Sequence, residues 1–186
     1  MKKIASWVAL ALGVLVYLIG PALTGTASTV PGNTRMNGIQ AEVLGVYFTP
    51  MSQAALPIVK SIDASEYEVL VQAYGFTHNA IAQALVRAHQ RGVKVRVLLD
   101  QKSQESNRYA IGVLADAQIE VRQDGKHVIA HNKVMVIDQA VVITGSFNFT
   151  NSAATRNAEN FLILKSPDLA LQYRLQWQNH WAHGVE

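Results

Sequence analysis

The chain has 186 residues, of which 49% are hydrophobic and 16% are charged, so it can bury the core of one domain. This composition excludes disordered, collagen-like and coiled-coil chains. The formal net charge of +3 favours a nucleic-acid partner only if the basic residues belong to the folded domain.

The first 27 residues have the layout of a secretory leader. Lys2 and Lys3 precede an apolar run over residues 4–19 that only Ser6 interrupts, and small residues at 25–27 offer a peptidase a cleavage site. We therefore expect a signal peptide over residues 1–27 and a periplasmic or secreted mature chain that begins at Ser28. The alternative is an N-terminal anchor that stays in the inner membrane, although the run is shorter than the roughly 20 residues that usually span a bilayer.

Removing this leader removes most of the basic excess. Two of the 16 Lys and Arg residues lie in it, so 14 remain beside 13 acidic residues, a net charge of +1. The chain has no cysteine, which excludes disulfides, a thiolate nucleophile and a Cys-based zinc site. Residues 28–38 are rich in Thr, Gly, Ser and Asn and predict a linker, followed by one domain over residues 39–186.

Strand-like and helix-like stretches alternate from residue 39 onward, which predicts an α/β fold. The expected strands cover residues 41–48, 67–74, 93–100, 119–122, 131–137, 141–144 and 161–165. The expected helices cover residues 52–64, 78–90, 106–115 and 167–181, with Thr77 capping the second and Ser166 the last. Because residues 131–137 and 141–144 are too close for a crossover helix, they should form a hairpin. We therefore expect a mixed sheet with helices on both faces.

Polar residues are densest at residues 131–153. Side chains alternate between the faces of a strand, so His131 and Lys133 project to one side and Asp138 to the other. An imidazole can attack or shuttle a proton, and an ammonium group can bind anionic oxygens, so this pair suits a phosphate-like group. We interpret Asp138 as a structural partner at the end of the strand.

A second group of polar residues follows Gly145. Ser146 and Asn148 share one face if the strand continues through Gly145, and both offer hydrogen-bond donors to a phosphate. The alternative is that Ser146, Asn148, Thr150 and Asn151 are turn and helix-cap residues after a hairpin.

These residues resemble a known signature. His131-x-Lys133-x4-Asp138, followed by Gly145-Ser146-x-Asn148, resembles the motif of the phospholipase D superfamily. Residues 73–101 and 129–153 resemble the small bacterial endonucleases of that superfamily, which carry one motif per chain. The resemblance extends over roughly residues 40–183, and it implies the phospholipase D-like fold.

The resemblance also implies a mechanism and roles for individual residues. His131 would attack phosphorus to form a phosphohistidine that water then hydrolyses. Lys133 and Asn148 would hold the non-bridging oxygens, Ser146 would support the site, and Glu159 would orient the imidazole. Since the chain has one motif, the resemblance implies a homodimer in which a second copy of His131 is the general acid, without metal or cofactor.

The other histidines show weaker patterns. His127 lies four residues before His131 and either lines the pocket or has a structural role at its rim. His180 and His183 lie in the last helix and the tail, where we expect packing or surface roles. No three metal ligands recur at a usual spacing, so the sequence predicts no metal site.

Three functions are compatible with these sequence patterns. The first is an endonuclease of low sequence preference acting on DNA or RNA, the second is a hydrolase of phospholipid head groups, and the third is a non-catalytic nucleic-acid-binding protein. The first draws on basic residues that could follow a nucleic-acid backbone or could simply be solvated. These residues are Arg87, Arg91, Lys94, Arg96, Lys102, Arg108, Arg122 and Lys126.

Overall fold

The computed structural model describes residues 38–186, so the predicted leader and nearly all of the linker lie outside the described residues. The described chain contains a seven-stranded sheet in the order β1-β7-β6-β5-β2-β3-β4. The strands are β1 (Glu42–Phe48), β2 (Glu68–Ala73), β3 (Lys94–Asp100), β4 (Glu120–Asp124), β5 (Lys133–Ile137), β6 (Val141–Gly145) and β7 (Asn160–Lys165).

The sheet is mixed, as predicted. β2 pairs in parallel with β3, and β3 pairs in parallel with β4. All other neighbouring strands are antiparallel, including the predicted β5–β6 hairpin. Antiparallel pairing of β2 with β5 places the end of β2 beside the start of β5.

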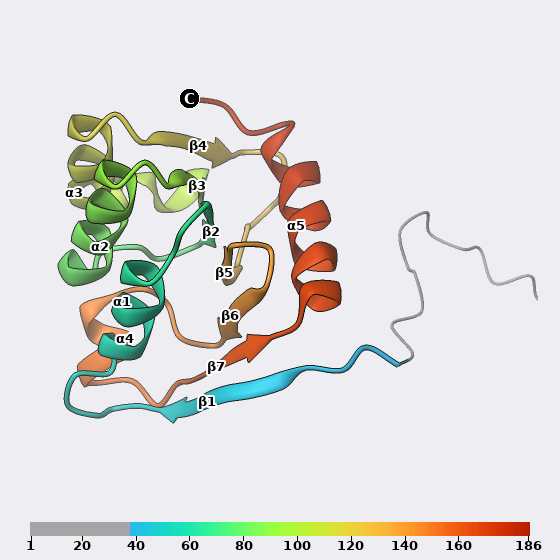
Figure 1. The fold of residues 1–186 in the computed structure, drawn as a ribbon. Helices are drawn as coiled ribbons and strands as arrows, with labels where there is room; N and C mark the ends of the chain where they lie inside the picture. The colour runs from blue at the N-terminus through green and yellow to red at the C-terminus, as the bar shows by residue number, and fades with distance from the viewer. Residues whose placement is uncertain (1–37) are drawn as a thin grey trace, which may run out of the picture. The chain divides into compact units, whose positions relative to one another are not determined.

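Helices cover both faces of the sheet, which confirms the predicted fold class (Figure 1). On one face lie α1 (Leu56–Asp63), α2 (Asn79–Gln90), α3 (Gln104–Asp116) and α4 (Asn151–Thr155), and on the other lies α5 (Pro167–Trp181). In the described residues, no helix is both long enough and apolar enough to cross a membrane.

Alternate residues of the central strands supply the two cores. In β2, Val69 and Val71 pack beneath α1–α3, whereas Leu70 packs toward α5. Trp177 of α5 completes this second core, and its indole N–H donates to the Val71 carbonyl at 2.9 Å. Every residue of β2 is buried, because it has helices on both sides.

Some predicted boundaries move for identifiable reasons. The helix expected at 52–64 begins at Leu56, because residues 52–55 form turns and Gln53 has a φ of 58°. The predicted Thr77 cap is wrong: His78 occupies the N-cap position, and no side chain caps α2. The backbone N–H groups of Thr77 and His78 both donate to the Phe149 carbonyl instead.

Side-chain caps set the starts of two further helices. Ser166 caps α5 as predicted, accepting a hydrogen bond from the Leu169 N–H. The bounds of the short helix α4 were not predicted, but the alternative that Thr150 caps a helix is confirmed, because its hydroxyl accepts from the Ala153 N–H. Five residues are too few to show a helical apolar period, so the sequence gives α4 no clear signal.

Two glycines should respond oppositely to alanine. A Cβ at Gly145 would overlap the Asn160 carbonyl oxygen and lie 2.7 Å from Cα of Phe161, both backbone atoms. We expect Gly145→Ala to lower the free energy of unfolding by about 1–3 kcal/mol. Gly112 lies within α3 with nothing within 4 Å of its added Cβ, so Gly112→Ala should raise that free energy by about 0.5–1 kcal/mol. Denaturant unfolding measures the change in the free energy of unfolding for each variant. Changes of the same sign would contradict the close approach of β6 and β7.

Candidate active site

The predicted reactive residues gather at one end of the sheet. Lys133 opens β5 and lies opposite Ala73, at the end of β2. The end of β6 reaches the same edge, and there Gly145 pairs with Phe161 at the start of β7. This pairing brings residues 131–133, 146–148 and 159–160 to neighbouring positions.

His131, Lys133 and Tyr74 form a contacting group. The Lys133 ammonium donates to the His131 carbonyl at 2.8 Å. The Tyr74 ring lies edge-on to the His131 imidazole, with centroids 4.9 Å apart, and its centroid is 5.6 Å from Lys133 Nζ. Lys133 is buried and His131 is exposed, so the ammonium is held in place while the imidazole can reach a substrate.

Buried side chains at the start of α3 support Tyr74 from behind. The Tyr74 carbonyl accepts hydrogen bonds from the Ser103 hydroxyl at 2.6 Å and from Asn107 Nδ2 at 2.8 Å. The Asn107 side chain also accepts from the Phe76 N–H, and Asn107 and Ser103 are both buried. The start of α3 thus fixes the segment that contacts His131, a relation that sequence spacing does not reveal.

Glu159 acts on Lys133 through its charge. Burial lowers the pKa of Lys133, and the Glu159 carboxylate partly offsets this effect. The Glu159 carboxylate accepts a hydrogen bond from Asn157 Nδ2 at 3.0 Å. The backbone N–H of Glu159 donates to the Thr49 hydroxyl at 3.1 Å. Thr49, directly after β1, therefore fixes the position of Glu159.

Asn148 has a free amide oxygen next to a glycine. Within residues 38–186, its Oδ1 atom is buried and has no hydrogen-bond partner. A side chain at Gly75 would lie 3.5 Å from the Asn148 Cβ and 3.0 Å from the Thr150 methyl, so Gly75 permits this close approach. Leaving a buried amide atom unpaired costs about 1–3 kcal/mol, a cost often associated with a ligand site.

Ser146 joins two strands at the rim of the site. Its hydroxyl accepts from the Asn160 N–H at 3.1 Å, and its own N–H donates to the Asn160 carbonyl at 2.9 Å. Since Asn160 follows Glu159, these bonds also set the position of the carboxylate.

Asp138 lies at the far end of β5, apart from this group. Its carboxylate accepts the backbone N–H groups of Glu66, Tyr67 and Glu68 at 2.8–3.0 Å. These are the residues that lead into β2, so Asp138 fixes the start of that strand.

His127 makes its contacts elsewhere. Its Nδ1 lies 2.8 Å from the buried Asp124 carboxylate, and its ring stacks on His180 with centroids 4.5 Å apart. His183 approaches the same carboxylate, so four possible metal-ligating side chains converge. No three of these residues recur at a usual ligand spacing in the sequence, but residues about fifty positions apart meet in space.

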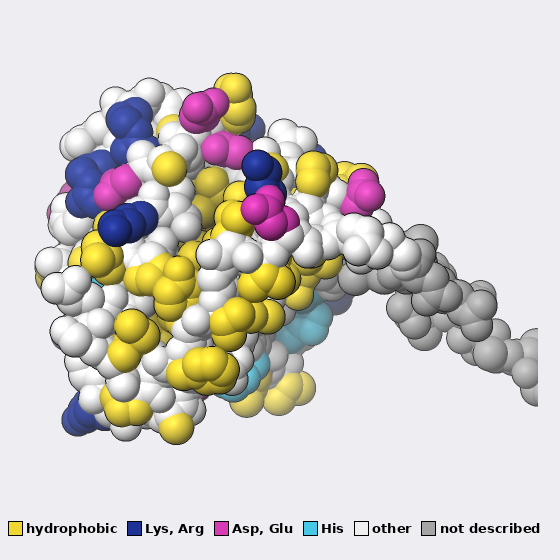
Figure 2. All heavy atoms as spheres, turned by 60° about the horizontal axis from the view of Figure 1, so that its bottom comes forward, with side chains coloured by type: hydrophobic (Ala, Val, Ile, Leu, Met, Phe, Trp, Pro, Cys, Tyr) yellow, Lys and Arg dark blue, Asp and Glu magenta, His cyan; other side chains and the backbone are white. Residues whose placement is uncertain are grey.

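Most of the eight basic residues are paired with acidic side chains. Five of the eight lie in ion pairs, and Figure 2 shows Lys and Arg side chains next to acidic ones. The pairs join Arg87 and Arg91 to Asp63, Arg96 to Glu68, Arg108 to Glu105 and Arg122 to Glu120. Arg96 and Arg122 also lie over the Trp181 ring, which gives them a packing role.

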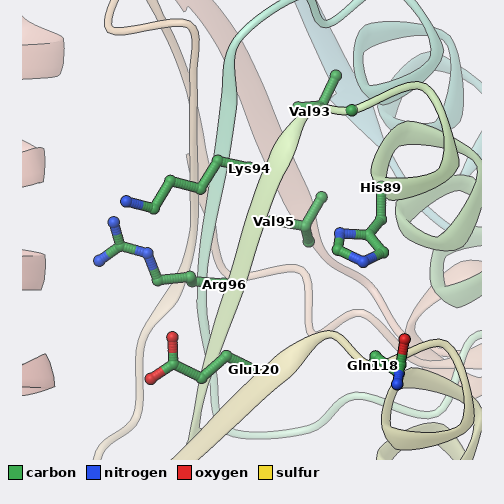
Figure 3. Close-up of a pocket in the computed structure, with 8 residues that line it drawn as sticks. His89, Val93, Lys94, Val95, Arg96, Gln118 and Glu120 are labelled. Carbon is green, nitrogen blue, oxygen red and sulfur yellow. The ribbon is translucent and has the colours of Figure 1, made fainter.

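A hollow of about 310 Å³ lies at the start of β3, the opposite end from Lys133. Figure 3 shows Lys94, Arg96 and Glu120 projecting to one side of the strands and His89 to the other. None of the predicted reactive residues lines this hollow, and Arg96 is already paired with Glu68. We therefore assign the reactive group, and not this hollow, as the candidate site.

Comparisons with known proteins show what the chain is similar to. The family model described as "Cardiolipin synthase, PLD-like domain" matches residues 58–181. The chain is 44% identical over 135 residues to "Phospholipase D" of Rickettsia felis, covering 73% of this chain and 68% of that protein. It is 31% identical over 133 residues to "Mitochondrial cardiolipin hydrolase" of Mus musculus, covering 71% and 60% of the two chains.

Two solved structures share the fold. One is Nuc from Salmonella typhimurium, described as a phospholipase D family member, with a TM-score of 0.74 and 34% identity. It is matched over 78% of this chain and 97% of its own. The other is NucT from Helicobacter pylori, with a TM-score of 0.71 and 25% identity over 78% and 99% of the two chains.

The charge coupling between Glu159 and Lys133 can be tested directly. Replacing Glu159 by Gln removes the charge that raises the pKa of Lys133, so this pKa should fall further below its ordinary value. The ammonium would then lose its proton, and its attraction for anions, at a lower pH. NMR titration of the Lys133 side chain measures the shift. Glu66→Gln, at an exposed position, should leave the pKa of Lys133 unchanged; an unchanged pKa in Glu159→Gln would disprove the coupling.

Proposed function

Because the chain belongs to the phospholipase D family of phosphodiesterases, we propose that it cuts DNA or RNA through a phosphohistidine intermediate. The observation that carries this proposal is the grouping of an exposed His131 imidazole with the buried Lys133 ammonium and the charge of Glu159. The resemblance of residues 73–101 and 129–153 to single-motif bacterial endonucleases favours a nucleic acid as the substrate.

The proposed reaction has two displacements at phosphorus. The unprotonated imidazole nitrogen of His131 forms a bond to phosphorus while the bond from phosphorus to the leaving oxygen breaks, and a general acid protonates that oxygen. Water then attacks phosphorus and gives a proton to the group that acted as the general acid, while the bond from phosphorus to the His131 nitrogen breaks; this releases the second product and restores the imidazole. Lys133 and the Asn148 amide stabilise the charge on the non-bridging oxygens.

Two lysines support a polymeric, anionic substrate. Lys102 follows β3 and Lys126 follows β4, so both lie at the end of the sheet that carries Lys133. Neither forms an ion pair within the described residues, unlike most of the arginines. They can therefore contact phosphates next to the reacting one, on the β3–β4 side of the site.

We also propose that a second copy of the chain supplies the general acid. One chain supplies one His131, whereas the two displacements use a nucleophile and an acid. The edge strand β1 exposes apolar side chains, with Val46 52% and Phe48 68% exposed, directly before the Thr49 that holds Glu159. Figure 2 shows apolar side chains gathered on this side of the molecule, a surface suited to a second copy.

Phospholipid hydrolysis is the second candidate, and an apolar cavity favours it. The cavity measures about 290 Å³ and lies between the turn before α1, the start of α2 and α4. Met51, Ala54, Leu56 and Val59 line it, and such a lining would accept part of an acyl chain. The names of the relatives from Rickettsia felis and Mus musculus point in the same direction.

Plasmid nicking in the presence of EDTA tests the reaction. We expect the wild-type chain to nick the plasmid and His131→Ala to lose at least about 10³-fold of that activity, because the nucleophile is gone. His89→Ala, a change in α2 away from the reactive group, should keep it.

Release of head groups from phosphatidylcholine and cardiolipin vesicles is measured in parallel. Head-group release without nicking would replace the nuclease proposal by the phospholipid one. Nicking that His131→Ala retains, or that EDTA abolishes, would overturn the mechanism.

A mixed dimer tests the shared site. Wild-type and His131→Ala chains carrying different affinity tags are co-expressed, and the heterodimer is purified through both tags. If one site uses both histidines, the heterodimer should be nearly inactive, whereas independent sites would leave about half of the activity. A wild-type pair carrying the same two tags is the control. A fully active monomer would contradict the shared site.

A further inference from the structure

Four side chains converge at the end of the edge strand β4. Asp124 is the last residue of β4, and its side chain is completely buried. His127 Nδ1 lies 2.8 Å and His180 Nδ1 3.3 Å from its Oδ2 atom, and His183 Nε2 lies 3.3 Å from its Oδ1 atom. One potential ligand atom from each of the four residues lies within 4.8 Å of every other.

The fold holds these residues together through the C-terminal tail. The backbones of Gln123 and Val185 exchange two hydrogen bonds, N–H to carbonyl at 2.6 and 3.0 Å, which pair the tail with β4. Gly184 makes this approach feasible, because a Cβ there would lie 3.0 Å from the Leu98 side chain and 3.1 Å from the Arg122 Cβ. The last turn of α5 and the tail therefore place His180 and His183 over Asp124.

The local chemistry suits a cation. A buried carboxylate needs a compensating charge, and the three imidazoles beside it offer nitrogen atoms that can hold a divalent cation there. His180 and His183 are also largely buried, with side chains 13% and 22% exposed, so an ion at this position would be shielded from solvent.

His183 adds an independent observation. Its Nε2 atom is buried and, within residues 38–186, makes no hydrogen bond. The 3.3 Å approach to Asp124 is close enough for an ion pair but lacks hydrogen-bond geometry. A ring nitrogen that faces a buried carboxylate without bonding to it is placed as a metal ligand would be.

We propose that Asp124, His127, His180 and His183 bind a divalent transition metal of the Zn²⁺ class. Three imidazoles and one carboxylate form a closed set of four, as in structural zinc sites. Bonds of about 2.0–2.2 Å require tetrahedral ligand atoms to lie about 3.4 Å apart, so the side chains must draw together by about 1 Å. The ion would replace the hydrogen bond between Gln72 Nε2 and His180 Nδ1, which measures 2.8 Å.

The bound metal would tie three segments together. It would join the end of β4, the loop that begins at His127 and the C-terminal tail. The far end of this loop is already fixed, since the Ala130 N–H donates to Asp100 at 2.7 Å, and His131 follows directly. None of the four ligands belongs to the reactive group, so the role that we assign to the ion is to stabilise this loop.

Metal binding to the full-length chain, prepared without an affinity tag, tests this proposal. The protein is stripped with EDTA, dialysed, titrated with Zn²⁺ by calorimetry and analysed for bound metal by mass spectrometry. We expect about one Zn²⁺ per chain and a rise in the melting temperature. His127→Ala and His183→Gln should each weaken Zn²⁺ binding at least about tenfold. His127 is half-exposed, and circular dichroism checks that both variants are folded.

Two control variants locate the ion. His89→Ala removes a histidine outside the cluster, and His131→Ala removes the proposed nucleophile; both should bind Zn²⁺ as the wild type does. Failure of the wild type to bind about one equivalent, or unchanged affinity in both folded cluster variants, would overturn the proposal. Loss of binding in His131→Ala alone would place the metal at the phosphodiesterase site and overturn it as well. Because binding is measured without substrate, these outcomes are independent of whether the chain cuts nucleic acid.

Discussion

The antiparallel register between β2 and β5 determines where the reactive residues lie. It sets Ala73 opposite Lys133, so the end of β2, with Tyr74, meets the start of β5, with His131. The register is itself constrained, because β2 is buried on both faces and a slip by one residue would exchange the side chains of the two cores. Packing of the sheet and geometry of the site are thus set by the same contacts.

The fold could be predicted from the sequence wherever a local pattern is strong. The apolar strands, the β5–β6 hairpin and the Ser166 cap with Pro167 all agree with the structure. The helix α4 and the start of α1 were missed or misplaced, because short turns depend on tertiary contacts. The Phe149 carbonyl, for example, accepts the N–H groups before α2, and nothing near Thr77 in the sequence indicates this.

The same distinction applies to the site. His131, Lys133, Ser146 and Asn148 are close in sequence, so strand parity and the motif identify them together. Glu159 acts on Lys133 from the far side of the β6–β7 connection, and only the resemblance indicated it. The support from Asn107 and the cluster around Asp124 depend on contacts between segments that are distant in the sequence. No local sequence pattern indicates such contacts.

Many charged side chains of this molecule act in pairs, and neither sign is in large excess. Most arginines of the domain are bound to carboxylates or lie over tryptophan rings, where they hold helices and strands in place. The lysines after β3 and β4 remain available at the reactive end of the sheet. Attraction for an anionic polymer would therefore be local, with little contribution from the net charge of the whole domain.

The pairing of Val185 with Gln123 also affects how copies of the sheet can associate. A sheet has two edges, and a molecule with both edges open can add neighbours on each side and grow into a fibre. Here the tail occupies part of the β4 edge, whereas β1 at the other edge remains exposed and apolar. Pairing of two copies through β1 would use this edge in both, so it would favour a closed pair over an open-ended filament.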